Sequence, residues 1–491
     1  MLCGVTIVGI NPVTLKEDTT QYSAAAYKVR DNAPVEDLVK KLPGVDVDAD
    51  GNITTKGKQI TKVRINGKDV FGGDVQSITK NLPADVVENI QMIDDYGDQA
   101  NLTGIKTGEP NQIMNITIRK DKNYGYSANL TGGSGRDDQP KIANDTRYVG
   151  LVNAFNFKGD QQVYLLANLN NTNANLFTFG GGGGRGGGGG RGGFGGRGGS
   201  QTKDGITDAH SAGFNYRDQW GKSLSVYGSY SFADNSSYIT STVRQSTNTG
   251  LNNTSSIEND KNINHRFTWN MEYKPDTINY LKITPNFSYS SSTTNYSDES
   301  TSTRKSDAAG NIHYTSTTPS TSTTPNYGTF ILYNHRFGGH GRNFSAYVNA
   351  SSNHTDQYQN PIYVYTQGKP TSAPFQQVTT GSRVNSIGTT LSYIEPLSRL
   401  SFLELNYAFN HSHTTSDKET LSKYIDGDPY ILNPDLSNDY RYIFTTNRVS
   451  LNYRFVQKQY NYTLGLGVQP GLLDGFSPST GQSTHVNTFN I

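Results

Sequence analysis

Beyond about Tyr124, apolar and polar residues alternate along one segment after another, and this alternation constrains the fold more than any other feature of the chain. Successive side chains of a β-strand point to opposite faces of the sheet. Within Ser223–Phe232, the even positions include Leu224, Val226, Tyr230 and Phe232, and the odd positions include Ser223, Ser225, Ser229 and Ser231. The pattern predicts strands with one apolar and one polar face.

Comparable segments recur to the C-terminus, separated by polar linkers. They are Tyr124–Thr131, Tyr148–Phe157, Gln162–Asn170, Ala212–Tyr216, Leu224–Phe232, Phe267–Tyr273, Leu281–Tyr289, Phe344–Ala350, Ile387–Ile394, Leu400–Phe409, Val449–Phe455 and Tyr460–Val468. Alternation and turn signals together give roughly 14–16 strand candidates. We expect these strands to form a large antiparallel sheet.

Two architectures can use such strands. A soluble sandwich buries the apolar face in strands of about 5–6 residues. A transmembrane barrel turns the apolar face to lipid in strands of about 9–11 residues, with aromatic residues at their ends and turns that are short on one side and long on the other. The candidate strands are nearer the second length, and linkers range from Lys158–Asp160 and Gln219–Lys222 to Ser290–Tyr327. The pattern favours an antiparallel transmembrane β-barrel over residues 123–491.

Residues 1–122 differ, because helical and strand periods alternate over short distances. Val5–Gly9, Lys62–Ile65 and Ile113–Arg119 are expected strands, and Asn66-Gly67 is the strongest two-residue hairpin signal in the chain. We also expect a helix over Asn32–Leu42. Further expectations are an Asn32 cap for that helix, an apolar face of Val35, Leu38, Val39 and Leu42, a hairpin over Val45–Ile53 and a short helical turn at Pro83-Ala84-Asp85. The segment is predicted to be a small α/β domain.

Composition excludes several classes of protein. The 491 residues carry a formal net charge of +1, and 11% are aromatic, which argues against a disordered chain and against a dedicated nucleic-acid binder. The run 180–199 is rich in glycine, with three arginines and one phenylalanine. We interpret it as a loop of the barrel, and a soluble RNA-binding protein with RGG repeats is the weaker alternative. The single cysteine, Cys3, excludes an intrachain disulfide.

No set of catalytic or metal-binding residues stands out. Asp46, Asp48 and Asp50 match the opening of a calcium loop, but the position that requires a bidentate glutamate is Gly57. The nine histidines are scattered, and no hydrolase, zinc-protease or phosphate-binding motif occurs. We therefore expect neither an enzyme nor a bound cofactor or metal.

Three stretches carry a resemblance to a known family. They are APVEDLVKKLPGVDVDADGNI, RINGKDVFGGD and KNLPADVVENIQMIDDYGDQANLTG. The chain resembles the plug domain of TonB-dependent receptors over about Val5–Lys122, and in particular the branch common in Bacteroidota. Beyond Lys122 the resemblance lies in the strand pattern alone. It implies an α/β plug inside an outer-membrane barrel of about 22 strands.

The same resemblance gives structural roles to individual residues. It implies that Asn66 and Gly67 form the hairpin turn of the plug. Two plug loops would contain Phe71, Gly72, Gly73 and Asp74 in one case, and Leu82, Pro83 and Asp85 in the other. Asp94, Asp95 and Asp98 would lie in the segment after the third plug strand. The ligand-binding residues stay unknown.

The function implied is energy-coupled uptake of a scarce ligand, such as an iron chelate, a glycan or a peptide, through a plugged barrel in the outer membrane. The partners implied are the TonB energy-transducing complex, outer-membrane lipid, the small ligand and a surface lipoprotein, and no nucleic acid. Since the chain shows no signal peptide and fewer strands than the family, we expect a receptor truncated at both ends. The alternative function is a non-transporting barrel that binds or assembles partners at the surface.

Overall fold

The computed structural model describes residues 11–48, 51–103, 109–137, 146–173, 205–304, 310–338, 341–368, 373–457 and 461–490. Cys3, the expected strand Val5–Gly9, Asp50, the glycine-rich run 180–199 and one of the nine histidines, His340, lie outside these ranges. Within them, every helix is too short or too polar to cross a bilayer.

The first part of the chain, which we call the N-terminal unit, contains two small sheets and short helices. A six-stranded sheet has the order β1-β2-β8-β9-β6-β7, and a three-stranded sheet has the order β3-β4-β5. The strands are β1 (Val13–Leu15), β2 (Thr19–Ser23), β3 (Val45–Val47), β4 (Ile53–Thr55), β5 (Lys58–Gln59), β6 (Lys62–Ile65), β7 (Lys68–Asp69), β8 (Val87–Asp95) and β9 (Asn111–Ile118). The helices are η1 (Ala24–Ala26), α1 (Val35–Val39), η2 (Phe71–Gly73), α2 (Val75–Thr79), η3 (Ala84–Val86), α3 (Asp98–Thr103) and η4 (Lys120–Lys122).

The helix expected over Asn32–Leu42 is shorter, and its expected cap is wrong. Pro34 occupies the N-cap position of α1, whereas Asn32 lies outside the helix in a left-handed conformation with φ 57°. The first free N–H, that of Val35, donates to the carbonyl of Leu82 rather than to an asparagine side chain. Proline fixes φ and lacks an N–H, so it starts the helix two residues later than the polar pattern suggested.

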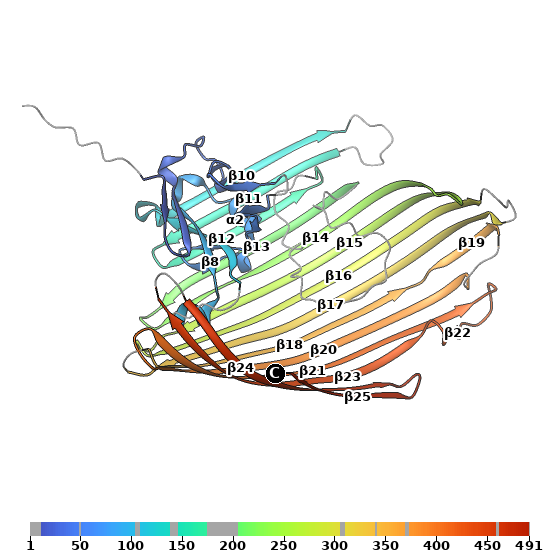
Figure 1. Ribbon diagram of the computed structural model, residues 1–491. Helices are drawn as coiled ribbons and strands as arrows, with labels where there is room; N and C mark the ends of the chain where they lie inside the picture. The colour runs from blue at the N-terminus through green and yellow to red at the C-terminus, as the bar shows by residue number, and fades with distance from the viewer. Residues whose placement is uncertain are drawn as a thin grey trace, which may run out of the picture.

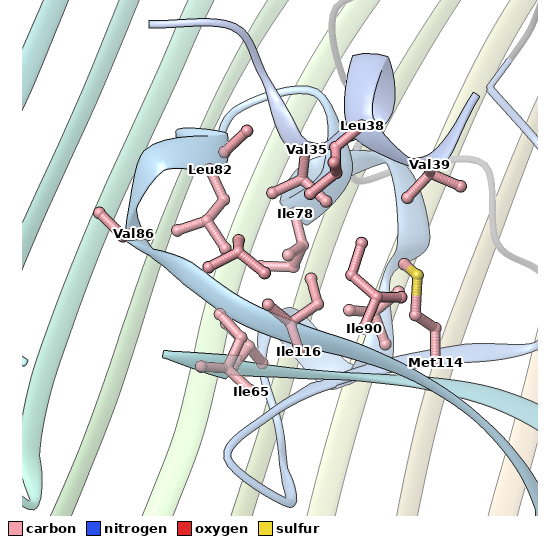
Figure 2. Packing of buried hydrophobic residues seen from close by; sticks show 14 of the residues in the cluster. Val35, Leu38, Val39, Ile65, Ile78, Leu82, Val86, Ile90, Met114 and Ile116 are labelled. Carbon is pink, nitrogen blue, oxygen red and sulfur yellow. The ribbon is translucent and has the colours of Figure 1, made fainter. Parts of the chain in front are cut away.

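The apolar face expected for this helix is correct and forms the core. Val35, Leu38, Val39 and Leu42 are all buried. Figure 2 shows Val35, Leu38 and Val39 of α1, together with Ile78, packed over strand residues such as Ile90 and Ile116. Burying each large aliphatic side chain stabilises the fold by about 1.5–3 kcal/mol.

The rest of the chain forms one antiparallel sheet of 16 strands, which we call the large sheet. Neighbours in sequence are mostly neighbours in space, and Figure 1 shows the strands running side by side from β10 to β25 in a broad curve, with the N-terminal unit near one end. The strands are β10 (Tyr124–Arg136), β11 (Thr146–Lys158), β12 (Gln161–Asn170), β13 (Ile206–Trp220), β14 (Leu224–Ser246), β15 (Gly250–Tyr273), β16 (Asn279–Arg304), β17 (Ile312–Arg336), β18 (Asn343–Gln359), β19 (Ile362–Gln367), β20 (Phe375–Pro396), β21 (Ser401–Lys423), β22 (Ile431–Leu432), β23 (Asn438–Val456), β24 (Asn461–Ser477) and β25 (Gln482–Asn490). The expected small α/β unit followed by a large antiparallel sheet of 14–16 strands is confirmed.

The long linker expected at Ser290–Tyr327 is wrong. Its first part continues β16 and its second part belongs to β17, a strand that the alternation pattern missed. These strands of 26 and 25 residues pair from Asn279↔His335 to Ser302↔Ile312. Serine and threonine indicated a loop, but threonine also suits a strand, and pairing with neighbours on both sides satisfies the backbone.

Candidate functional site between the N-terminal unit and the large sheet

One face of the large sheet contacts the N-terminal unit, and strand register identifies its residues. Residues paired across antiparallel strands share a face. Glu272, which contacts Lys68, pairs with Lys282, and Lys282 contacts Asp98. Lys282 pairs with Leu332, which pairs with Tyr347. Ser345, two residues from Tyr347, therefore lies on the same face, and it contacts Gln99. We call this face the inner face, and most of its side chains near the unit are polar.

The opposite, outer face carries apolar side chains that are exposed. Leu405, Leu451 and Leu466 are paired neighbours on β21, β23 and β24, with exposed fractions of 50%, 48% and 70%. A second row crosses β13 to β17, and its paired members are Phe214, Tyr230, Phe267, Phe287 and Tyr327. Contiguous exposed apolar surface of this kind marks contact with a membrane or a partner. The face assignment predicted for Ser223–Phe232 agrees with this register.

An apolar patch on the inner face joins the core of the N-terminal unit. Phe155 and Phe157 of β11, with Tyr164 and Leu166 of β12, are buried in one cluster with the unit. The Tyr164 ring lies 6.4 Å from that of Phe71 and 5.4 Å from that of Phe155. These separations suit edge and tilted aromatic packing. The first strands of the large sheet therefore hold the unit by hydrophobic contact.

Further along the sheet, charged groups replace the apolar contacts. Lys68 of β7 donates to Glu272 of β15 at 2.6 Å, and Tyr227 of β14 donates to the same carboxylate at 2.7 Å. The Lys68 Nζ also lies 5.1 Å from the centre of the Tyr227 ring. Burial lowers the pKa of Lys68, and the neighbouring Glu272 offsets this only in part. The three groups form one anchor, in which Glu272 and Tyr227 are buried and Lys68 is partly exposed.

Further polar contacts cross the same interface. Lys282 donates to Asp98 at 2.6 Å, and Gln99 donates to Ser345 at 3.1 Å. Two arginines of the sheet donate to backbone carbonyls of the unit. They are Arg217, 3.1 Å from the Ile65 oxygen, and Arg336, 2.7 Å from the Leu102 oxygen.

A charge network inside the unit stiffens the hairpin that carries Lys68. Arg64 of β6 donates to Asp69 at 2.8 Å and to Asp95 at 3.0 Å, and Lys62 lies 3.6 Å from Asp69. Burial opposes the charge on Asp69, but Lys62 and Arg64 outweigh it and hold its pKa below the ordinary value. The network ties β7 to the end of β8.

Asn66 and Gly67, assigned by resemblance to a hairpin turn, form the loop between β6 and β7. Their φ angles are 48° and 79°, which suits an Asn-Gly turn of the type that hairpins prefer. The side chain of Asn66 accepts the N–H of Ile118, and the N–H of Gly67 donates to Asn115. The turn is thereby fixed to β9.

Phe71, Gly72 and Gly73 form η2, and all three have positive φ. This is rare for a bulky residue such as Phe71. Its N–H donates to Asn215 of β13 at 3.1 Å, and its ring enters the apolar patch, so contacts with the large sheet hold the strained conformation. Asp74 caps α2 by accepting the N–H of Ser77 at 2.7 Å.

The remaining predicted residues lie in two places. Leu82 is buried in the core, Pro83 is the N-cap of η3, and Asp85 is exposed. Asp94 and Asp95 are the last two residues of β8, and Asp94 is paired with Gln112 of β9. Asp98 begins α3.

A cavity of about 470 Å³ separates η2 and α3 from the inner face of β14 to β17. Lys62, Asp69, Gly72 and Asp98 line it from the unit. The sheet contributes mainly polar groups, including Ser229, Arg266, Thr268, Asn270, Lys282, Thr284, Asn286 and Ser288. None of these sheet residues was singled out from the sequence. Alternation in Arg266–Tyr273 places the polar residues on one face, but it does not show what that face meets.

No family model matches the sequence, and no curated protein matches it. Among solved structures, the chain is similar to the open form of the ferric-catecholate import receptor Fiu from E. coli K12, with a TM-score of 0.35 and 10% identity over 98% of this chain and 77% of that one. For FpvA of P. aeruginosa bound to pyoverdines, the values are 0.37 and 9% over 98% and 71%. For the unliganded ferric citrate transporter FecA, they are 0.36 and 10% over 96% and 78%.

Proposed function

We propose that this chain is a TonB-dependent receptor of the outer membrane, and that it takes up a scarce ligand such as an iron chelate, a glycan or a peptide. Residues 1–122 would form the plug and residues 123–491 the barrel wall. One observation carries the proposal: the N-terminal unit docks on the polar inner face of a large sheet whose outer face is apolar and exposed. The plug-like motifs of the sequence lie in the docked unit.

The docking interface suits a plug that is held and then moved. Contacts with β13 and with β15 to β18 include ion pairs and hydrogen bonds, which water can replace when the unit shifts. Water cannot replace the contacts of the apolar patch on β11 and β12 in this way, because exposing the patch costs hydrophobic free energy. A pull by the TonB complex would therefore open the polar side first and leave the apolar side as the pivot.

Uptake by whole cells tests the proposal. Cells that express the chain receive labelled ferric citrate, maltoheptaose or a hexapeptide, with and without a protonophore. The expected result is accumulation of one probe that stops when the proton gradient collapses. A matched variant carries Gln99→Cys, Ser345→Cys and Cys3→Ser, so that a short bismaleimide can join the unit to the sheet at the observed contact. Cross-linking should stop uptake, and each single-cysteine variant should keep it.

A second candidate is a non-transporting barrel that binds or assembles partners at the surface. The paired extension of β16 and β17 favours it, because serine and threonine cover a long polar sheet that could serve as a platform. Binding of a probe without gradient-dependent accumulation would support this candidate and contradict transport.

A further inference from the structure

The cavity between η2 and the inner face holds more positive than negative groups. Lys62, Arg266 and Lys282 line it with Asp69 and Asp98. Both carboxylates are engaged: Asp98 accepts from Lys282 at 2.6 Å, and Asp69 pairs with Lys62 at 3.6 Å and with Arg64 behind it at 2.8 Å. Among the three positive groups, the guanidinium of Arg266 is therefore left without a carboxylate partner in the cavity.

Arg266 forms no hydrogen bond or ion pair with any described residue, and it is half-buried. A guanidinium is a planar fork of donors that matches a carboxylate or a phosphate group with two parallel hydrogen bonds. Inside a protein, a charged group without a partner is costly. A ligand that supplies an oxyanion would remove that cost.

The neighbours of Arg266 are small polar side chains. Strand pairing places Ser231 and Ser288 directly beside it, and Thr268 follows it on the same face, paired with Ser229 and Asn286. Hydroxyl and amide groups can donate to further oxygens of an anion. The side chains that flank the guanidinium can therefore complete the coordination of an oxyanion.

Gly72 forms the opposite wall. A Cβ built on it would lie 3.9 Å from the guanidinium carbon of Arg266, so the absence of a side chain leaves the approach to the arginine open. The backbone of Gly72 has φ 66°, a conformation that favours glycine. The volume of about 470 Å³ lies within the range of small-molecule sites.

We infer that Arg266, with Ser288 and Thr268, binds a carboxylate or phosphate group of a small anionic ligand in the cavity beneath η2. The inference names the substrate class of the proposed transporter and so rests on the proposed function. It assigns selectivity to the wall of the sheet, at a position that faces Gly72 of the N-terminal unit.

Equilibrium binding to the purified full chain in detergent micelles tests this inference. The probes are citrate for carboxylates and pyrophosphate for phosphates, and maltoheptaose serves as the neutral comparison. The wild type should bind at least one of the two anions, and it should do so in the absence of iron. Arg266→Gln should weaken binding by about tenfold or more, and Arg266→Lys should fall between, because lysine keeps the charge without the fork. Arg244→Gln, at an exposed arginine of β14 outside the cavity, should bind as the wild type does.

A second pair of variants keeps the test decisive if Arg266→Gln does not fold. Ser288→Asp places a carboxylate directly across from Arg266, where it would occupy the guanidinium and reduce anion binding by about tenfold. Ser288→Ala should cause a much smaller loss. The inference is overturned if the wild type binds neither anion, or if Arg266→Gln and Ser288→Asp bind as tightly as the wild type. Because no energised partner takes part, these outcomes are independent of whether cells accumulate a ligand.

Discussion

Lys68 and Glu272 are 204 residues apart in the sequence and 2.6 Å apart in space. Their side chains are 21% and 8% exposed, so the pair is largely withdrawn from water. This contact and the Tyr227 hydroxyl fix the tip of the β6–β7 hairpin to the inner face. The N-terminal unit is therefore anchored through a hairpin whose turn is Asn66-Gly67.

Replacing Glu272 by Gln should loosen this anchor. The change leaves the Lys68 ammonium in a half-buried site without its counter-charge, and removing one partner of such a pair costs about 2–5 kcal/mol. Hydrogen exchange of the β6 and β7 amides should speed up. Glu258→Gln, on the same strand but away from the unit, is the control and should leave exchange unchanged. Equal protection in both variants would show that the ion pair does not hold the hairpin.

Two glycines allow backbone strain to be separated from crowding. Gly67 and Gly73 have φ of 79° and 85°, and a Cβ on Gly67 would meet nothing within 4 Å, whereas one on Gly73 would lie 3.0 Å from Lys62. Gly67→Ala should cost about 1–2 kcal/mol from the left-handed conformation alone. Gly73→Ala should lower the free energy of unfolding of the unit by more, as measured by chemical denaturation. A smaller loss for Gly73→Ala would mean that Lys62 moves aside freely.

Asp69 should make the unit sensitive to acid. Its pKa in the folded state lies below the ordinary 3.8, so the folded state favours the charged form. The stabilisation is complete above pH 3.8 and is lost as the pH falls through the lowered folded value. In Asp69→Asn this contribution is absent at every pH, so the gap in stability between wild type and variant should shrink on acidification. Pepsin cleavage rates of the unit below pH 4.5 would show it, and a constant gap would contradict it.

The two faces of β21 should respond oppositely to a new charge. Leu405 lies on the outer face and Asn406 on the inner face, which also carries Ser345 and Ser392. If the outer face meets lipid, Leu405→Arg should destabilise the membrane-inserted form by about 2–4 kcal/mol near the middle of the bilayer. Asn406→Arg should have little effect. Urea unfolding in lipid vesicles measures both, and similar losses would contradict a lipid-facing outer surface.

Local signals in the sequence predicted local structure well. Asn66-Gly67 indicated a hairpin turn, and the alternation in Ser223–Phe232 indicated the two faces of β14, because both follow from backbone geometry within a few residues. The apolar face of α1 was also correct. Pro34 displaced the expected cap since its ring sets the backbone regardless of nearby asparagine.

Such local signals could not predict which distant segments pair or come into contact. β17 was missed because serine, threonine and proline are frequent in loops, and only pairing with β16 and β18 makes them a strand. Arg266 could not be singled out from the sequence. Its lack of a partner becomes apparent only when residues of three distant segments are seen to line one cavity. The same holds for Glu272 and Lys282, whose partners precede them by about the length of a whole domain.

The strand order of the two sheets has a consequence for assembly. Nearly every strand of the large sheet finds its partner next along the chain, so the sheet can grow one hairpin at a time from β10. The six-stranded sheet cannot, because β6 pairs in parallel with β9 only after β8 has been made. Because this unit is synthesised before the large sheet, and β10 is followed at once by β11 and β12, which carry the apolar patch, the unit offers a surface on which the first hairpins can pack. The growing sheet would then be shaped around a body that is already present.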